Sequence, residues 1–152
     1  MRLFTIGYAG HTQASLVEAL KEAGVEQVVD VRANPVSRMK GFSKNQLAAV
    51  LEEAGIAYRS VTELGIPTAD RKAAGTSGWN DLIRSYAESL DSEQGRLGAA
   101  KVLAEECNSK STAIMCLESD LDHCHRKPLG EWVAARTGMD LHHIQSPPRD
   151  ET

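Results

Sequence analysis

The sequence alternates short β-prone runs with longer stretches in which apolar residues recur at helical spacing. The β-prone runs lie at residues 3–6, 27–31, 56–61, 112–116 and 141–144. The helical patterns lie at residues 12–23, 43–54, 79–90, 92–107 and 128–137. This alternation predicts an α/β domain with a mainly parallel sheet. Because the strand runs are short apolar runs and do not alternate strictly, helices are expected on both faces of the sheet.

The length of 152 residues suits one domain with a substantial core and is too short for two full ones. We therefore expect a single three-layer α/β domain over residues 1–146, with a sheet of about five strands in the order 3-2-1-4-5. Residues 147–152 are expected to form a frayed tail.

Residues typical of helix ends support these boundaries. Thr12 suits an N-cap, and Ser43 with Gln46 forms a capping-box pattern. Pro128 suits the first turn of the last helix. Glycines follow the predicted helix ends at Gly24, Gly55 and Gly138. Residues 63–78, rich in Gly, Pro, Thr and charge, are predicted to form a long loop, and such loops are usually functional or mobile.

Composition narrows the class of function. No apolar run is long enough to span a bilayer and the start lacks a signal-peptide pattern, so we expect a cytoplasmic protein without a membrane partner. The net charge of −4 argues against a protein that relies on nonspecific contacts with nucleic acid. A single-strand groove remains an alternative, using Arg32, Arg38, Lys40 and Trp79. The sequence does not indicate the oligomeric state.

The densest cluster of reactive side chains lies between Cys116 and Arg126. These eleven residues contain two of the three cysteines, two of the five histidines, three acids and an arginine. Burying such groups without partners is expensive, so we expect one wall of an active or binding site. An odd number of cysteines in a chain without an export signal is not expected to form a disulfide framework.

Cys124 is the strongest candidate for chemistry in this cluster. It lies near the start of a predicted helix, between two histidines and close to Arg126, and such surroundings lower the pKa of a thiol. We interpret it as a nucleophile or redox thiol, with His125 as its acid/base partner. The alternative for His125 is a helix cap. Cys116 ends a buried strand, where a cysteine is more often a small apolar residue.

Metal binding is a second interpretation of the same residues. Cys116, Cys124 and His125 are zinc-ligand types, and His11 or His123 would complete four ligands. No second pair of closely spaced cysteines supports this interpretation, so no metal site is predicted. The sequence identifies no cofactor.

Polar residues also follow the first two predicted strands, and ligands of open α/β sheets bind at the carboxyl ends of strands. Residues 7–11, with Tyr8 as a residue for stacking, form either a phosphate-binding turn or a tight turn that needs glycine. Asp30 and Arg32 point to the same face, either as a bracing ion pair or as catalytic groups. A basic stretch suits an anionic ligand or a solvated surface equally, and it consists of Arg32, Arg38, Lys40 and Lys44.

Three stretches together resemble one family: residues 5–12, residues 29–38 with 41–44, and residues 115–118 with 124–126. In order and spacing they are similar to the bacterial and archaeal family catalogued as domain of unknown function 488. The resemblance covers nearly the whole chain and implies a small α/β domain without an established activity. It also implies shared polar positions at Asp30, Arg32, Cys116, Glu118, Cys124, His125 and Arg126. His11 departs from the pattern, in which an alcohol or arginine is expected, and indicates a local specialisation.

We interpret the site as that of an enzyme acting on a small anionic substrate, phosphate- or nucleotide-like, at the carboxyl edge of the sheet. The predicted catalytic residues are Cys124, His125, Asp30 and Glu118. The predicted substrate-binding residues are Tyr8, His11, Arg32, Cys116, Arg126 and Glu63, the last reaching over the site. The alternative functions are a non-catalytic metal- or nucleotide-binding module and a protein that binds single-stranded nucleic acid.

Overall fold

One parallel five-stranded sheet organises the computed structural model, which describes residues 2–117 and 124–145. Its strands are β1 (Leu3–Gly7), β2 (Gln27–Asp30), β3 (Ala57–Ser60), β4 (Thr112–Cys116) and β5 (Leu141–Ile144). All four pairings between neighbouring strands are parallel. The predicted α/β class and the five strands are confirmed, with β2 and β3 shorter at their ends than expected.

The strand order is β3-β2-β4-β1-β5, which differs from the predicted 3-2-1-4-5 by the exchange of β1 and β4. The prediction placed β1 beside β2 because it followed the strand order of doubly wound α/β sheets, in which β1 and β4 meet where the order reverses. In the structure β4, buried along its whole length, lies between them. The carboxyl ends of β1 and β4 are still adjacent, with Gly7 opposite Cys116, and Asp30 lies opposite Met115.

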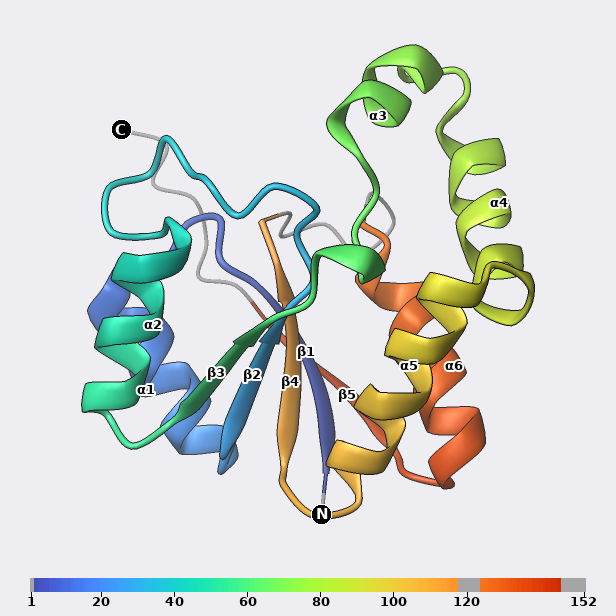
Figure 1. Cartoon of the computed structure of the whole chain (residues 1–152). Coiled ribbons are helices and arrows are strands. Elements are labelled where there is room, and N and C mark those ends of the chain that lie inside the picture. Colours follow the sequence, from blue (N-terminus) through green and yellow to red (C-terminus); the bar gives the residue numbers. More distant parts are fainter. Residues whose placement is uncertain (1, 118–123, 146–152) are drawn as a thin grey trace.

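Helices cover both faces of the sheet and give the predicted three layers (Figure 1). Helices α1 (Gln13–Ala23) and α2 (Lys44–Glu53) lie on one face. Helices α5 (Gln94–Cys107) and α6 (Arg126–Thr137) lie on the other, and α4 (Trp79–Ser92) packs against both of them. The buried apolar residues accordingly form two clusters, one on each side of the sheet. Among the described residues, no helix is long and apolar enough to cross a membrane.

The helix ends follow the sequence pattern with one exception. Thr12 is the N-cap of α1 and forms a capping box with Ser15, and Gly24 ends that helix in the left-handed conformation. Ser43 is the N-cap of α2, but the predicted capping box is wrong because its side chain makes no cap hydrogen bond. The Ser43 hydroxyl instead accepts the backbone N–H of Ser37 at 3.0 Å, which folds the loop after β2 back on itself.

The prediction that residues 63–78 form a long loop is wrong. They contain part of a 3₁₀ turn, η1 (Thr62–Leu64), and the short helix α3 (Thr68–Ala74). None of the α3 residues is buried, so the segment has no apolar periodicity from which a helix is recognised. Helix α3 projects from the body of the molecule beyond the carboxyl edge of the sheet (Figure 1).

Hydrogen bonds fix the segment before α3 to the body of the protein. The Tyr86 hydroxyl donates to the Leu64 carbonyl at 2.6 Å, and Arg96 Nη2 donates to the Gly65 carbonyl at 3.0 Å. Gly65 packs so closely on Ala33 that a Cβ atom at this position would lie 2.2 Å from the Ala33 backbone nitrogen. This close approach holds the loop after β2 against the segment that leads into α3.

Candidate functional site

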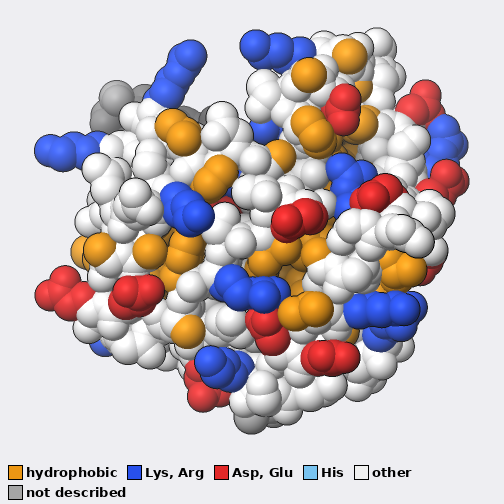
Figure 2. Space-filling model, viewed as in Figure 1, with side chains coloured by type: hydrophobic (Ala, Val, Ile, Leu, Met, Phe, Trp, Pro, Cys, Tyr) orange, Lys and Arg blue, Asp and Glu red, His pale blue; other side chains and the backbone are white. Residues whose placement is uncertain are grey.

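A pocket of about 550 Å³ opens at the carboxyl edge of the sheet, where ligands of parallel α/β sheets bind. Its lining comes from the ends of β1 and β4, the loop after β2, residues 66–79 around α3, and the start of α6. In the space-filling view the top of the molecule is notched between the α3 side and the opposite side, and Lys or Arg side chains project on both sides (Figure 2). A volume of this size is typical of small-molecule sites.

The turn after β1 contributes Tyr8 to the pocket. The backbone N–H groups of Tyr8 and Ala9 donate to the carbonyls of Cys116 and Leu117, at 3.0 and 2.9 Å, so the β1 and β4 ends are joined beyond the strands. The Tyr8 ring stacks on Phe42 with centroids 4.9 Å apart. Neither glycine of the predicted phosphate-binding turn is among the pocket-lining residues. Gly10 has a φ of +87°, as a tight turn requires.

Asp30 and Arg32 form a buried ion pair beside the pocket. Arg32 Nη2 lies 2.6 Å from Asp30 Oδ2, and Arg32 Nε donates to both carboxylate oxygens at 2.9 and 3.0 Å. Arg32 Nη1 also donates to the Tyr8 hydroxyl at 3.2 Å and to the Phe42 carbonyl at 2.8 Å. Arg32 lines the pocket, whereas Asp30 lies behind it and is fully buried. These contacts favour the bracing interpretation of Asp30 over a catalytic one.

The ion pair raises the pKa of Arg32 itself and contributes to the raised pKa of the neighbouring Tyr58. Burial alone would lower the pKa of Arg32, but the hydrogen bonds and negative charge of Asp30 outweigh burial and raise that pKa above its ordinary value. Burial and the hydrogen bond to Asp30 raise the pKa of Tyr58, whose hydroxyl donates to Asp30 Oδ2 at 2.5 Å. Arg32 is therefore charged, and Asp30 neutralises most of that charge.

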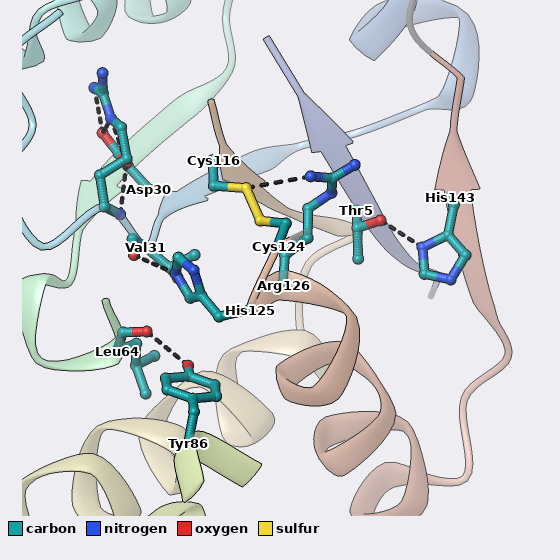
Figure 3. Close-up of a disulfide and its surroundings, with 11 residues drawn as sticks. Thr5, Asp30, Val31, Leu64, Tyr86, Cys116, Cys124, His125, Arg126 and His143 are labelled. Atoms are coloured by element: carbon teal, nitrogen blue, oxygen red, sulfur yellow. Dashed lines mark hydrogen bonds and ion pairs between the residues drawn. A yellow bond between two sulfur atoms is a disulfide. The ribbon is translucent and has the colours of Figure 1, made fainter. Parts of the chain in front are cut away.

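Cys116 and Cys124 are joined by a disulfide, and both line the pocket (Figure 3). This bond corrects the expectation that the cysteines form no disulfide framework and the interpretation of Cys124 as a thiol. The reason is topological: β4 ends at Cys116, and α6 begins just after Cys124 on the same edge of the sheet. The third cysteine, Cys107, is free and buried in α5, and burial raises its pKa to about 11.

Arg126 lies behind the two cysteines, away from the pocket lining. Its side chain is 2% exposed, and Nη1 donates to Cys116 Sγ at 3.2 Å (Figure 3). Arg126 is not among the residues that line the pocket, and its guanidinium contacts the sulfur of Cys116.

His125 lines the pocket next to Cys124. Its Nε2 lies 2.8 Å from the Val31 carbonyl, and because a carbonyl only accepts, Nε2 carries the proton and Nδ1 bears the lone pair. The ring also meets Tyr86 edge-on, with centroids 5.2 Å apart. Burial, aided by nearby arginines, lowers the pKa of His125 to about 4. At neutral pH the ring is uncharged and a weak base. His125 is the N-cap residue of α6, as its alternative role predicted, although its side chain makes no cap hydrogen bond.

Two other predicted site residues, His11 and Glu63, are not among the residues that line the pocket. His11 is buried beside α1, where Nδ1 lies 3.0 Å from Ser15 Oγ and burial lowers its pKa. Glu63 is exposed on η1 and is not among the pocket-lining residues. Glu118, like His123, lies outside the described residues. Within residues 2–117 and 124–145, no group of three or more His, Cys, Asp or Glu side chains is placed to hold a metal ion.

The sequence analysis missed the wall of the pocket that residues 66–79 provide. Arg71 on α3 and Trp79 at the start of α4 line the pocket, with Asn34 and Val36 from the loop after β2 on other parts of the lining. Arg71 and Trp79 lie between β3 and β4 in sequence, far from the motifs at the strand ends. The signal for Arg71 is a Gly- and Pro-rich segment with two adjacent cations, Arg71 and Lys72, whereas Trp79 is the aromatic residue of the predicted single-strand groove.

The described residues that line the pocket include two arginines, Arg32 and Arg71, and no acid. Arg71 is exposed, and no ion pair to an acid is recorded for it within the described part of the chain. The amino end of the twelve-residue helix α6, which carries partial positive charge, reaches the pocket through His125. The pocket lining also includes two exposed apolar side chains, Val36 and Leu117, which are 71% and 43% exposed.

Comparison with known families gives one match. The model of the family described as "Domain of unknown function DUF488" matches residues 12–133, which is most of the chain. The matched range contains the Asp30–Arg32 pair, both pocket cysteines and His125. A comparison with curated proteins finds no match.

Proposed function

We propose that this chain, which belongs to the family of domain of unknown function DUF488, is an enzyme acting on a small anionic substrate of phosphate or nucleotide type. The observation that carries the proposal is that one pocket combines cationic groups with Cys124 and His125. The family description names no activity, and the residues of the site support the proposal.

Two cations and a helix end favour an anion. Arg71 supplies a charge at the pocket wall that no recorded acid within the described residues offsets. Arg32 uses four of its five N–H groups on Asp30, Tyr8 and Phe42, which leaves one Nη2 donor without a partner among the described residues. The amino end of α6 adds a third favourable element. An anion here would gain charge-assisted hydrogen bonds from a guanidinium that is already held in place.

The rest of the lining suits a ring or another apolar part of the substrate. Trp79 and Tyr8 are aromatic, and Val36 and Leu117 expose apolar surface at the pocket edge. A purely inorganic anion would leave this surface in water. A ligand with an anionic group and a flat or apolar body would use both kinds of surface, which is why we extend the proposal from phosphate to nucleotide-like molecules.

The proposed chemistry places Cys124 as a nucleophile when it is reduced. A thiolate there would be stabilised by the amino end of α6. His125 is too weak a base to hold the thiol proton, since its pKa is about 4. We therefore assign His125 an orienting role: it ties the start of α6 to Val31 and offers Nδ1 as a hydrogen-bond acceptor. Asp30 is assigned the orientation of Arg32.

Ligand titration tests the anion site. Reduced protein is titrated with inorganic phosphate, adenosine monophosphate and glucose 6-phosphate, with thermal unfolding and ¹H–¹⁵N chemical shifts as readouts. Arg71→Gln is expected to weaken binding about tenfold through loss of a charge-assisted contact. Lys72→Gln is the matched control, because Lys72 is the exposed neighbour of Arg71 and does not line the pocket. No response to any of the three ligands at millimolar concentration would contradict the proposal.

Product formation tests the catalytic part. Phosphate esters that bind are followed by ³¹P NMR with the reduced protein and with Cys124→Ser. Conversion that disappears in Cys124→Ser supports the enzyme. Binding without conversion would instead favour the non-catalytic binding module.

A further inference from the structure

The bonded cysteines lie at the pocket wall and are not sealed away from it. Cys116 and Cys124 are only 3% and 4% exposed, yet both contribute to the pocket lining. A small thiol that enters the pocket would meet this bond. Cys107 provides the contrast, since it is buried in α5 and belongs to no pocket described here.

The surroundings of the two sulfurs are unequal. Buried Arg126 donates from Nη1 to Cys116 Sγ at 3.2 Å. A disulfide sulfur is a weak acceptor, whereas a thiolate would pair strongly with a guanidinium that is always charged. The hydrogen bond from Arg126 is therefore strongest when the disulfide breaks and its electron pair stays on Cys116.

Cys124 has a different support. It lies immediately before His125, the residue at the amino end of α6, and helix N-termini stabilise thiolates. His125 in turn holds this helix start to Val31. Both sulfurs can thus carry negative charge, and Arg126 contacts Cys116 directly.

We propose that Cys116 and Cys124 are a redox-active pair that exchanges with small or protein dithiols, with Cys124 forming the mixed disulfide and Cys116 as the sulfur that leaves. This goes beyond the proposed function by adding thiol–disulfide exchange at the same pocket. It depends on the two cysteines and Arg126 and needs no anionic ligand.

The exchange balances in two steps. A thiolate of the dithiol attacks Cys124 Sγ, the Cys116–Cys124 bond breaks, and its electron pair stays on Cys116 Sγ beside Arg126. The second thiol of the dithiol loses its proton to solvent and attacks the sulfur bonded to Cys124, which releases Cys124 as a thiolate. The dithiol is oxidised to a disulfide by two electrons and the cysteine pair is reduced. The cysteines then take up protons from solvent according to their pKa values.

Native reduction gives the first test. Oxidised protein is treated with millimolar dithiothreitol without denaturant, quenched with acid, denatured, alkylated with iodoacetamide and mapped by mass spectrometry. We expect alkylation of Cys107 alone before dithiothreitol and of all three cysteines after it. A pair that stays resistant until the protein is unfolded would overturn the proposal.

The single-cysteine variants test which sulfur forms the mixed disulfide. Cys116→Ser and Cys124→Ser are incubated with glutathione disulfide, and addition of glutathione is followed by intact mass. We expect Cys124 in Cys116→Ser to react at least about tenfold faster than Cys116 in Cys124→Ser, because a thiolate whose pKa Arg126 keeps low is a better leaving group but a weaker nucleophile. Cys107, present in both variants, is the internal control and should stay unmodified. Equal rates, or a faster Cys116, would contradict the assigned direction.

The arginine contact is tested by Arg126→Lys and Arg126→Met. Loss of the guanidinium should slow reduction by dithiothreitol about tenfold in Arg126→Met, with a smaller effect in Arg126→Lys, because a leaving thiol of higher pKa departs more slowly. Circular dichroism checks the fold, and if Arg126→Met does not fold, the comparison of single-cysteine variants decides alone. Phosphate binding, measured in the same variants, separates the two proposals. Thiol–disulfide exchange without phosphate binding would contradict only the proposed anion site. Phosphate binding without exchange would contradict only the proposed redox pair.

Discussion

Tyr58 on β3 donates its hydroxyl to Asp30 at the end of β2, with 2.5 Å between the oxygens, so a residue outside the pocket braces the carboxylate that holds Arg32. Asp30 is fully buried and Arg32 is 7% exposed. The arrangement makes three side chains from two strands and one loop depend on one another. Asp30 and Tyr58 are expected to contribute unequally to the free energy of unfolding, so variants of the two residues can be compared.

Asp30→Asn should destabilise the protein far more than Tyr58→Phe. Removing the carboxylate charge leaves the buried Arg32 cation without its counterion, at a cost of about 3–5 kcal/mol in the free energy of unfolding. Tyr58→Phe removes one hydrogen bond, and should cost about 1 kcal/mol. Urea unfolding of both variants measures the difference; similar losses would mean that the ion pair is not the main contribution.

His125 should make stability depend on pH between about 4 and 6.5. Its pKa is lowered to about 4 in the folded state by burial, against an ordinary value of 6.5. The unfolded chain therefore binds more protons in this interval, so His125 stabilises the fold above pH 6.5, and that contribution is lost as the pH falls toward 4. The difference in unfolding free energy between wild type and His125→Gln should shrink by about 2–4 kcal/mol from pH 7 to pH 4.

The measurement is urea unfolding at several pH values for both proteins. Subtracting the variant from wild type cancels the contributions of His11 and His143, whose pKa values are also lowered by burial. A difference that stays constant with pH would show that His125 is not held neutral by the fold.

Gly65→Ala should destabilise the protein and disturb the pocket. The new Cβ would lie 2.2 Å from the Ala33 nitrogen, and Ala33 lines the pocket, so the loop after β2 has to move. We expect a loss of about 1–3 kcal/mol, typical of overpacking. Gly98→Ala is the matched control, because no atom lies within 4 Å of a Cβ there and the residue is in the middle of α5. It should be neutral or stabilise by up to about 1 kcal/mol. Thermal unfolding distinguishes the two variants.

Trp79 should report ligand binding by fluorescence. Of the two tryptophans in the sequence, Trp79 lines the pocket, while Trp132 donates Nε1–H to Asp91 and stacks with Arg136 on α6. Adenosine monophosphate added to Trp132→Phe should change the emission of Trp79, and the same addition to Trp79→Phe should leave the emission of Trp132 unchanged. A response confined to Trp132 would place the ligand elsewhere.

The fold class was predictable from the sequence because apolar runs and helical periodicity report burial directly, as in β4 and α1. The exchange of β1 and β4 in the strand order was not predictable from the sequence. Which strands are neighbours depends on tertiary packing, and local sequence patterns do not contain that information. Helix α3 escaped detection for the opposite reason: with no buried residue it carries no periodic signal. Local patterns therefore report what an element buries and are silent on its neighbours.

The candidate site was predictable to the extent that it lies at strand ends. Tyr8, Arg32, Cys116, Cys124 and His125 meet at one pocket, as the positions of their motifs indicated. Arg71 reaches it from a distant segment and is revealed by the three-dimensional structure, whereas the sequence suggested Trp79 only as part of a single-strand groove. The contact of Arg126 with Cys116 depends on the direction of a side chain, which spacing along the chain does not encode.

The place of β4 in the sheet also orders the events of synthesis. Strand β1 is paired with β4 and β5 alone, so none of the hydrogen bonds that hold it in the sheet can form before residue 112 has been made. Strand β2 gains β3 much earlier, but it too lacks its inner neighbour until then. The nascent chain must therefore carry the apolar residues of β1 without sheet partners until β4 has been made. Strands with such non-local pairing fold slowly and are prone to aggregate before they pair.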